Sequence, residues 1–117
     1  AGALGVMAGS SLGGTVGGAV GRSDEDTKTN KRPAGKDARE FLDNLDTKKY
    51  DQKPEYGGEK DLYGGMAQSA LKSKMGRSYV EQGADGTLMV DAVKGFGAVL
   101  TAQKDMHERL KKLEGIA

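Results

Sequence analysis

The chain of 117 residues contains no cysteine and no tryptophan, and only two phenylalanines and four tyrosines. Without cysteine it cannot form disulfides, use a thiol nucleophile or bind a metal through thiolates. Hydrophobic residues make up 36% of the sequence and aromatics 5%, whereas charged residues reach 30% and glycine occurs 19 times. This composition predicts a small hydrophobic core that offsets little of the conformational entropy lost on folding. We therefore expect the chain to gain order within an assembly.

The sequence also has almost no net charge and only one histidine. The formal net charge is +1, which gives no overall electrostatic attraction to nucleic acid or to an anionic membrane. The single histidine, His107, follows Asp105, and no nucleophile elbow or phosphate-binding loop accompanies it. Asp24, Glu25 and Asp26 lack the spacing of a calcium-binding EF-hand loop. The sequence predicts that the protein is not an enzyme and has no metal site and no cofactor.

The first 21 residues carry no charged side chain, since the first charge belongs to Arg22. On a helix, residues four apart lie on one face, so a glycine row would form a groove beside an apolar ridge. A helix of this length spans about 30 Å, the thickness of the bilayer hydrocarbon. The glycine row is Gly5, Gly9, Gly13, Gly17 and Gly21, and the ridge is Leu4, Ala8, Leu12, Val16 and Val20.

Two interpretations of residues 1–21 stay open. The segment can be a glycine-zipper helix that packs against other helices or enters a membrane, or a flexible Gly/Ser-rich arm. Glycine costs about 1 kcal/mol per helical position relative to alanine, which favours the arm. The four-residue register favours the zipper, because a linker does not need one. The segment lacks the basic start of a secretory signal, and we expect Ala1, the residue left when an initiator methionine is removed, to be the mature N-terminus.

Residues 22–36 differ abruptly from the segment before them. They are highly charged, lack apolar periodicity and contain a proline, which predicts a solvated linker. A basic cluster in this linker can contact phosphate or lipid headgroups, but the acidic residues before it favour mutual neutralisation. The basic cluster consists of Lys28, Lys31, Arg32 and Lys36.

Residues 37–76 are predicted to contain short helices and a tyrosine-rich arm. The spacing of Asp37 and Glu40 is that of a capping box, so a helix is expected over Asp37–Thr47. The segment Lys48–Gly65 is expected to be an extended arm whose tyrosines anchor it to a partner; base stacking is the alternative, which the interleaved acidic residues disfavour. The residues predicted to dock on a partner are Phe41, Leu42, Leu45, Tyr50, Tyr56 and Tyr63.

A second helix is expected over Met66–Met75, ended by Gly76. Residues 77–117 are then predicted to form a strand, a turn, a second strand and a helix capped by Asp91. Apolar residues of this last helix fit a heptad register, with Gln103 as a polar residue on the seam. We expect it to associate with copies of itself; the alternative is packing within a larger partner. The predicted oligomerisation residues are Met89, Phe96, Val99, Gln103, Met106, Leu110 and Leu113.

The C-terminal passage GADGTLMVDAVKGFGAVLTAQKDMHERLKKLEG resembles the ends of tail-fibre and other virion proteins of bacteriophages. The uncharged glycine-rich N-terminus joined to a polar body resembles the small internal proteins of tailed phages. Those proteins are packaged in the virion and ejected ahead of the DNA to help build a conduit across the host envelope. The resemblance implies localisation in the virion and partners that include portal, tail or core proteins, copies of the chain itself and the host membrane. It carries over no catalytic residue.

Together these patterns predict a mainly α, extended and non-globular chain. Its parts are a glycine-zipper segment (1–21), a charged linker (22–36), short helices with a tyrosine arm (37–76), and a strand–turn–strand with a coiled-coil-like helix (77–117). The predicted function is that of a non-enzymatic phage virion component that aids genome delivery through a membrane-competent N-terminal segment. The alternatives are a structural adaptor, cement or tail protein whose arm packs between subunits, and a bacterial envelope glycine-zipper protein. Specific nucleic-acid binding is not expected.

Overall fold

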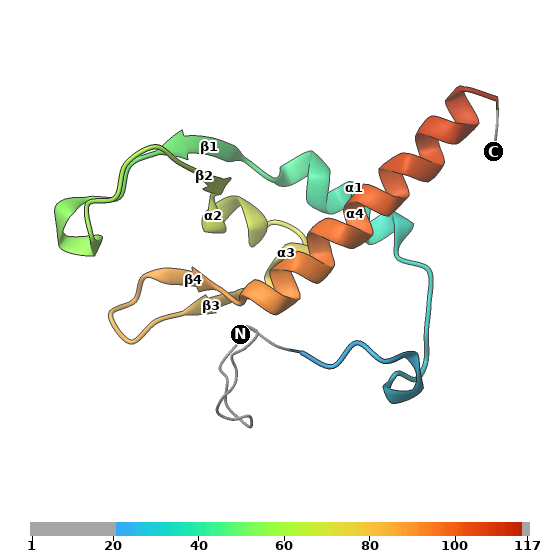
Figure 1. Cartoon of the computed structure of the whole chain (residues 1–117), viewed down its shortest axis with the longest axis horizontal. Helices are drawn as coiled ribbons and strands as arrows, with labels where there is room; N and C mark the ends of the chain where they lie inside the picture. The colour runs from blue at the N-terminus through green and yellow to red at the C-terminus, as the bar shows by residue number, and fades with distance from the viewer. Residues whose placement is uncertain (1–20, 116–117) are drawn as a thin grey trace.

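The computed structural model describes residues 21–115 (Figure 1). The glycine-zipper positions before Gly21 therefore lie outside the described residues. The described chain measures 49 × 35 × 23 Å. Its elements in chain order are η1 (Glu25–Thr27), α1 (Gly35–Asn44), β1 (Thr47–Tyr50), η2 (Pro54–Tyr56), β2 (Leu62–Gly65), α2 (Ala67–Ala70), α3 (Lys74–Arg77), β3 (Val80–Gln82), β4 (Leu88–Val90) and α4 (Ala92–Leu113).

The described fold is mixed α/β, so the prediction of a mainly α, coiled-coil-like chain is wrong. Strands β1 and β2 form one antiparallel hairpin, in which Thr47 pairs with Gly65, and β3 and β4 form another. The first hairpin replaces the predicted tyrosine arm. Its loop contains Gly57 and Gly58 at φ of +109° and +67°, values that glycine adopts without strain. Because β1 and β2 pair, their backbone N–H and carbonyl groups bond to each other.

The second hairpin confirms the strand–turn–strand prediction for the residues before α4. Val80 pairs with Val90 and Gln82 with Leu88. The carboxylate of Asp85 accepts hydrogen bonds from the backbone N–H and the hydroxyl of Thr87, at 3.0 and 2.6 Å. These bonds lower the pKa of Asp85, because they stabilise the ionised carboxylate. Both hairpins project from the same end of the molecule (Figure 1).

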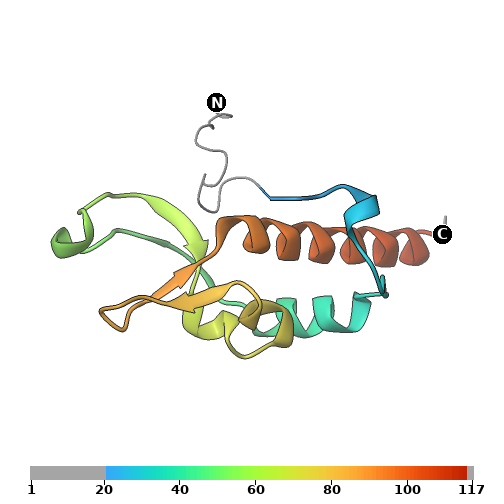
Figure 2. The ribbon, with the colours of Figure 1, turned by 90° about the horizontal axis from the view of Figure 1, so that it is seen from below.

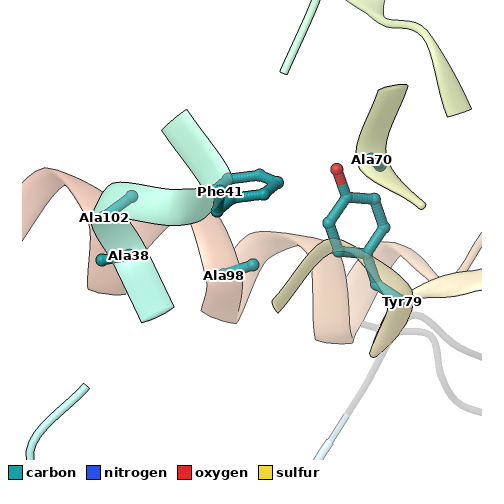
Figure 3. Packing of buried hydrophobic residues seen from close by; sticks show 6 residues of the cluster. All are labelled: Ala38, Phe41, Ala70, Tyr79, Ala98 and Ala102. Atoms are coloured by element: carbon teal, nitrogen blue, oxygen red, sulfur yellow. The ribbon is translucent and has the colours of Figure 1, made fainter. Parts of the chain in front are cut away.

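The core lies where α1, the α2–α3 segment and the middle of α4 meet (Figure 3). Phe41 of α1 is 1% exposed, and its ring meets that of Tyr79 edge to face, with centroids 6.0 Å apart. This geometry suits the quadrupoles of two aromatic rings. Ala98 and Ala102 of α4 complete the core, and their small side chains let α4 pack on α1.

Two predictions about helix ends between residues 35 and 77 are wrong. Helix α1 begins at Gly35, two residues before Asp37, and its N-cap residue Ala34 has no side chain that could cap it. The carboxylate of Glu40 accepts a hydrogen bond from the backbone N–H of Lys74, at 3.1 Å. The single helix expected over Met66–Met75 is two short helices. Ser73 separates them, since its hydroxyl caps α3 by accepting from the N–H of Gly76 at 3.0 Å.

The first residues of the described chain form a strap, residues 21–34, that runs along α4 (Figure 2). Gly21 lies against α4 so closely that a Cβ at this position would be 2.6 Å from Cγ1 of Val93. Ala34, at the other end of the strap, lines a hollow with Leu100 and Glu108. The segment predicted to be a linker therefore lies along α4, and helix α1 follows it in the chain.

Asp91 caps α4 as predicted, since its carboxylate accepts a hydrogen bond from the N–H of Lys94 at 3.0 Å. Replacing Asp91 by alanine is expected to lower the free energy of unfolding by about 1 kcal/mol, because this N–H loses its partner. Urea denaturation measures the change. Asp91→Asn retains a capping oxygen and serves as the control. If Asp91→Asn lowered the free energy of unfolding as much as Asp91→Ala, a capping role would be contradicted.

Tyr79 makes stability depend on pH in the alkaline range. Burial raises the pKa of Tyr79, because the core disfavours the charged phenolate. The phenol of Tyr79 thus ionises at lower pH in the unfolded chain than in the folded chain. Its contribution to the free energy of unfolding is complete below the unfolded pKa of about 10, and it is lost as the pH rises through the folded pKa. We expect Tyr79→Phe to flatten the loss of stability above about pH 10 in urea titrations, relative to Tyr56→Phe at an exposed position. Equal pH profiles would contradict this.

Candidate protein-binding surface

An exposed side of α4, next to the side packed on α1, carries large apolar side chains. Ala98 and Ala102 occupy the side that is packed. Gln103 and the residues three or four positions before and after it lie on a neighbouring side of the helix, which is exposed. Phe96 is 68% exposed, although it is one of only two phenylalanines in the chain. We define the outward face of α4 as Phe96, Val99, Leu100, Gln103, Met106, His107 and Leu110.

The outward face contains most of the residues predicted to mediate self-association. The five α4 apolar residues of that prediction are each 45% to 86% exposed, and Gln103 lies among them. Met89 is instead on β4, where it is 54% exposed. The heptad register missed Leu100, which is 54% exposed and lies four residues after Phe96. That spacing is the signal that identifies it, because i and i+4 share a helix face.

The predicted docking residues outside α4 divide into two groups. Phe41 is buried in the chain's own core, and Leu42 and Leu45 are partly buried against it. Their apolar stripe thus joins α1 to the rest of the chain. Tyr56 and Tyr63 are 54% and 75% exposed on the first hairpin. The third tyrosine of this set, Tyr50, is partly buried on the same hairpin.

Hollows flank the outward face on both sides. A hollow of about 520 Å³ lies between Gly21 of the strap and Phe96 of α4. Another, of about 540 Å³, lies between Tyr63 of the first hairpin and Val99 of α4. The ammonium of Lys49 lies 5.6 Å from the centroid of the Tyr63 ring, a cation–π contact. The apolar face therefore has partly polar borders on the hairpin and the strap.

Charge is distributed unevenly along α4. The first half, Ala92–Ala102, has one charged residue, Lys94, whereas the second half has four basic and two acidic residues. In this half, Glu108 lies 3.4 Å from Lys104 and 3.5 Å from Lys111. The hydrogen bond from Lys104 and the charges of both lysines lower the pKa of Glu108. These ion pairs border the outward face and leave its centre uncharged.

Asp105 connects the second half of α4 to α1. Its side chain is only 14% exposed, and its Oδ2 lies 3.7 Å from Nε of Arg39 and 3.8 Å from a guanidinium nitrogen of Arg109. Its Oδ1 would be 2.9 Å from a Cβ at Gly35, so it lies at the N-terminus of α1, where the helix dipole favours an anion. The carboxylate therefore holds α1 against α4 without contributing to the outward face.

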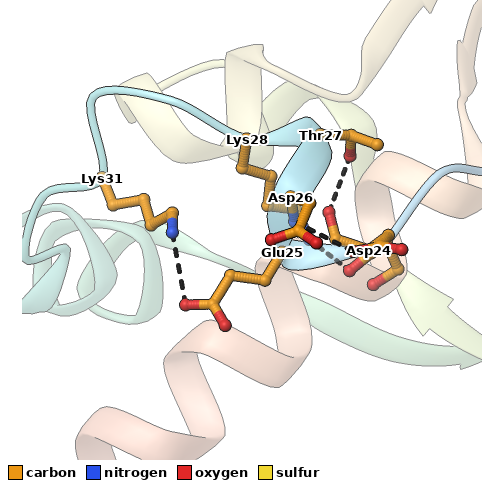
Figure 4. Close-up of polar contacts among 7 residues, drawn as sticks. Asp24, Glu25, Asp26, Thr27, Lys28 and Lys31 are labelled. Carbon is orange, nitrogen blue, oxygen red and sulfur yellow. Dashed lines mark hydrogen bonds and ion pairs between the residues drawn. The ribbon is translucent and has the colours of Figure 1, made fainter.

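Opposite charges within the strap neutralise one another (Figure 4). Lys31 lies 3.2 Å from the carboxylate of Glu25, and the ammonium of Lys28 donates to the carbonyl of Ser23 at 2.8 Å. Asp24 caps η1 by accepting from the N–H of Asp26 at 2.9 Å. These contacts support the interpretation of a mutually neutralised charged linker.

Two properties of residues 21–115 concern other kinds of site. Within this range, no cluster of three or more histidine and acidic side chains has the geometry to hold a metal ion. No helix in the same range is both long enough and apolar enough to cross a membrane. The N-terminal segment for which membrane entry was predicted lies mostly outside this range.

Comparison of the chain with protein-family models, with curated proteins and with solved structures gives no match.

Proposed function

We propose that the chain is a non-enzymatic structural component of a bacteriophage particle, in which α4 packs against a neighbouring subunit. The outward face is the observation that supports this proposal best. Its apolar side chains are exposed although another side of the same helix is packed, and grouped exposed apolar residues are typical of protein–protein contacts. The assignment to a phage particle depends on the resemblance of residues 83–115 and of the glycine-rich N-terminus to virion proteins.

The size of the apolar surface favours an assembly of many copies. Full burial of a large apolar side chain stabilises by about 1.5–3 kcal/mol, and the residues of the outward face are already about half covered. Five such residues then contribute roughly 4–8 kcal/mol, close to the 4–15 kcal/mol that association costs in lost freedom. One contact of this kind is weak, whereas repeated contacts in a particle reinforce each other through a high effective concentration.

Incorporation into particles tests the proposal. We expect the tagged chain to co-purify with phage particles from producing cells, and Leu100→Glu to reduce its incorporation at least tenfold, because the variant places a charge on the apolar face. Lys112→Glu is the control, since Lys112 is exposed but lies off this face. Quantitative mass spectrometry of the particles gives the copy number. Absence of the wild-type chain from purified particles would refute the proposal.

A second function, membrane entry during genome delivery, is favoured by the lack of charge in residues 1–21. A segment that is only marginally apolar suits a protein that is soluble in one setting and inserted in another. Liposome leakage tests it with the full chain and a chain that begins at Arg22. We expect leakage to require the first 21 residues, and Gly9→Leu with Gly13→Leu to abolish it by blocking close helix packing. If the full chain caused no leakage, membrane entry would be ruled out and the role of a structural adaptor would stand.

A further inference from the structure

We infer that the outward face of α4 binds a second copy of the same face, antiparallel, about a two-fold axis at Gln103. The inference specifies the partner of the surface used in the proposed function, and in that sense it rests on that function. In a two-fold interface the same patch serves both copies, so the patch must be complementary to itself under reversal of the helix direction.

The outward face meets this requirement because it is centred on the middle of α4. Helix α4 extends from Ala92 to Leu113, so Gln103 lies at its midpoint. The other members of the face occur three, four and seven residues before and after Gln103. Antiparallel pairing about this point brings each member opposite a member of the same face. The resulting pairs are Phe96 with the partner's Leu110, Val99 with the partner's Met106, and Leu100 with the partner's His107.

Gln103 sets the register of this pair. It is the central polar residue of the face, and at the two-fold axis its amide meets the same amide of the second copy. Each amide carries both donors and acceptors, so the two can bond to each other. A slip of three residues along the helix would place Gln103 against Leu100 or Met106 and leave its amide unpaired, which is costly in a desolvated contact.

The surface beside the midpoint has a hollow that suits the second copy. It has a volume of about 400 Å³ and is lined by Leu100, Gln103, Lys104 and His107. In the antiparallel pair, the partner's Leu100 approaches this hollow, and by symmetry each copy fills the hollow of the other. Close packing of a side chain into the hole on the facing helix is the usual geometry of paired helices.

Charge selects the antiparallel orientation over the parallel one. The second half of α4 carries a net charge of +2, from four basic and two acidic residues, while the first half has only Lys94. Parallel packing would place two halves of charge +2 side by side, and also align the two helix dipoles. Antiparallel packing places the basic half of one helix beside the first half of the other. Its basic C-terminal end then lies near the partner's Leu88–Val90 end.

Single-cysteine variants of the full chain test the geometry directly, because the natural sequence has no cysteine. Two cysteines form a disulfide only when their Cα atoms are within about 7 Å. Under mild oxidation, we expect Gln103→Cys to give a disulfide-linked dimer. Phe96→Cys alone should give at least tenfold less, since antiparallel packing separates its two copies by about 20 Å. A mixture of Phe96→Cys and Leu110→Cys should cross-link, and Lys112→Cys, off the face, is the control.

Each outcome decides the inference. Efficient cross-linking of Phe96→Cys with itself would show parallel packing and overturn it. A monomer by sedimentation together with no Gln103→Cys dimer would show that the face does not bind a second copy. If Leu100→Glu still reduced incorporation into particles in that case, the face would bind a different protein, and the proposed function would stand without this inference. The helical circular dichroism of each variant verifies that the chain is folded.

Discussion

Replacing Gly76 by alanine is expected to lower the free energy of unfolding by about 3 kcal/mol and to leave a large part of the chain unfolded. A Cβ at Gly76 would collide with the carbonyl oxygen of Ala70, and it would lie only 2.6 Å from the carbonyl carbon of that residue. The colliding atoms belong to the backbone of α2, so they cannot turn away as a side chain can. The new methyl group would instead push α3 from α2, in the buried part of the molecule where Ser73 also lies.

The same substitution at Gly97 is the matched control. Gly97 lies within α4, and nothing lies within 4 Å of a Cβ at that position. Alanine favours a helix over glycine by about 1 kcal/mol, so Gly97→Ala should raise the free energy of unfolding by up to that amount. Urea denaturation of both variants gives two changes of opposite sign. A destabilisation by Gly97→Ala, or none by Gly76→Ala, would contradict the close approach of α2 and α3.

Replacing Phe41 by alanine is expected to lower the free energy of unfolding by about 3–5 kcal/mol. Phe41 is 1% exposed and contacts the ring of Tyr79, so its removal leaves a cavity between α1 and the segment before β3. A core with only two large buried rings has few other side chains that can move into this space. The change is a large share of the 5–15 kcal/mol by which domains are usually stable.

Phe96→Ala provides the comparison, since Phe96 is the other phenylalanine and is 68% exposed. At concentrations where the chain is monomeric, its truncation should change the free energy of unfolding by no more than about 0.5 kcal/mol. Thermal and urea denaturation measure both variants. Equal losses for Phe41 and Phe96 would mean that the outward face is packed within the monomer, and would contradict the surface described above.

Elements with local signals could be predicted from the sequence. The turn between two short strands, the capping carboxylate of Asp91 and the apolar spacing after it identified the second hairpin and α4. The seam centred on Gln103 was also visible, because helical spacing alone places its residues on one face. The surface now proposed to bind a partner was therefore largely predictable.

Features that depend on tertiary contacts could not be predicted. Glu40 has the spacing of a capping residue, yet it bonds to Lys74, which is 34 residues away. The segment of the first hairpin was predicted to be an extended arm, because its lysines and glycines interrupt the alternation of apolar and polar residues that identifies a strand. Nor did the sequence distinguish which side of α4 would be packed, since Ala98 and Ala102 contribute little to an apolar pattern although they carry the contact with α1.

The packing of α4 on α1 through alanines joins parts of the chain that are far apart in sequence, which affects the expected order of folding. Ala38 and Ala98 are 60 positions apart, whereas the paired residues of the two hairpins are at most 18 positions apart. Loop closure is entropically more costly for the longer separation, so we expect the hairpins to form early and α4 to dock late. Until α4 docks, both sides of this helix are accessible to other chains. We therefore expect the protein to be most exposed to misassembly before α4 docks.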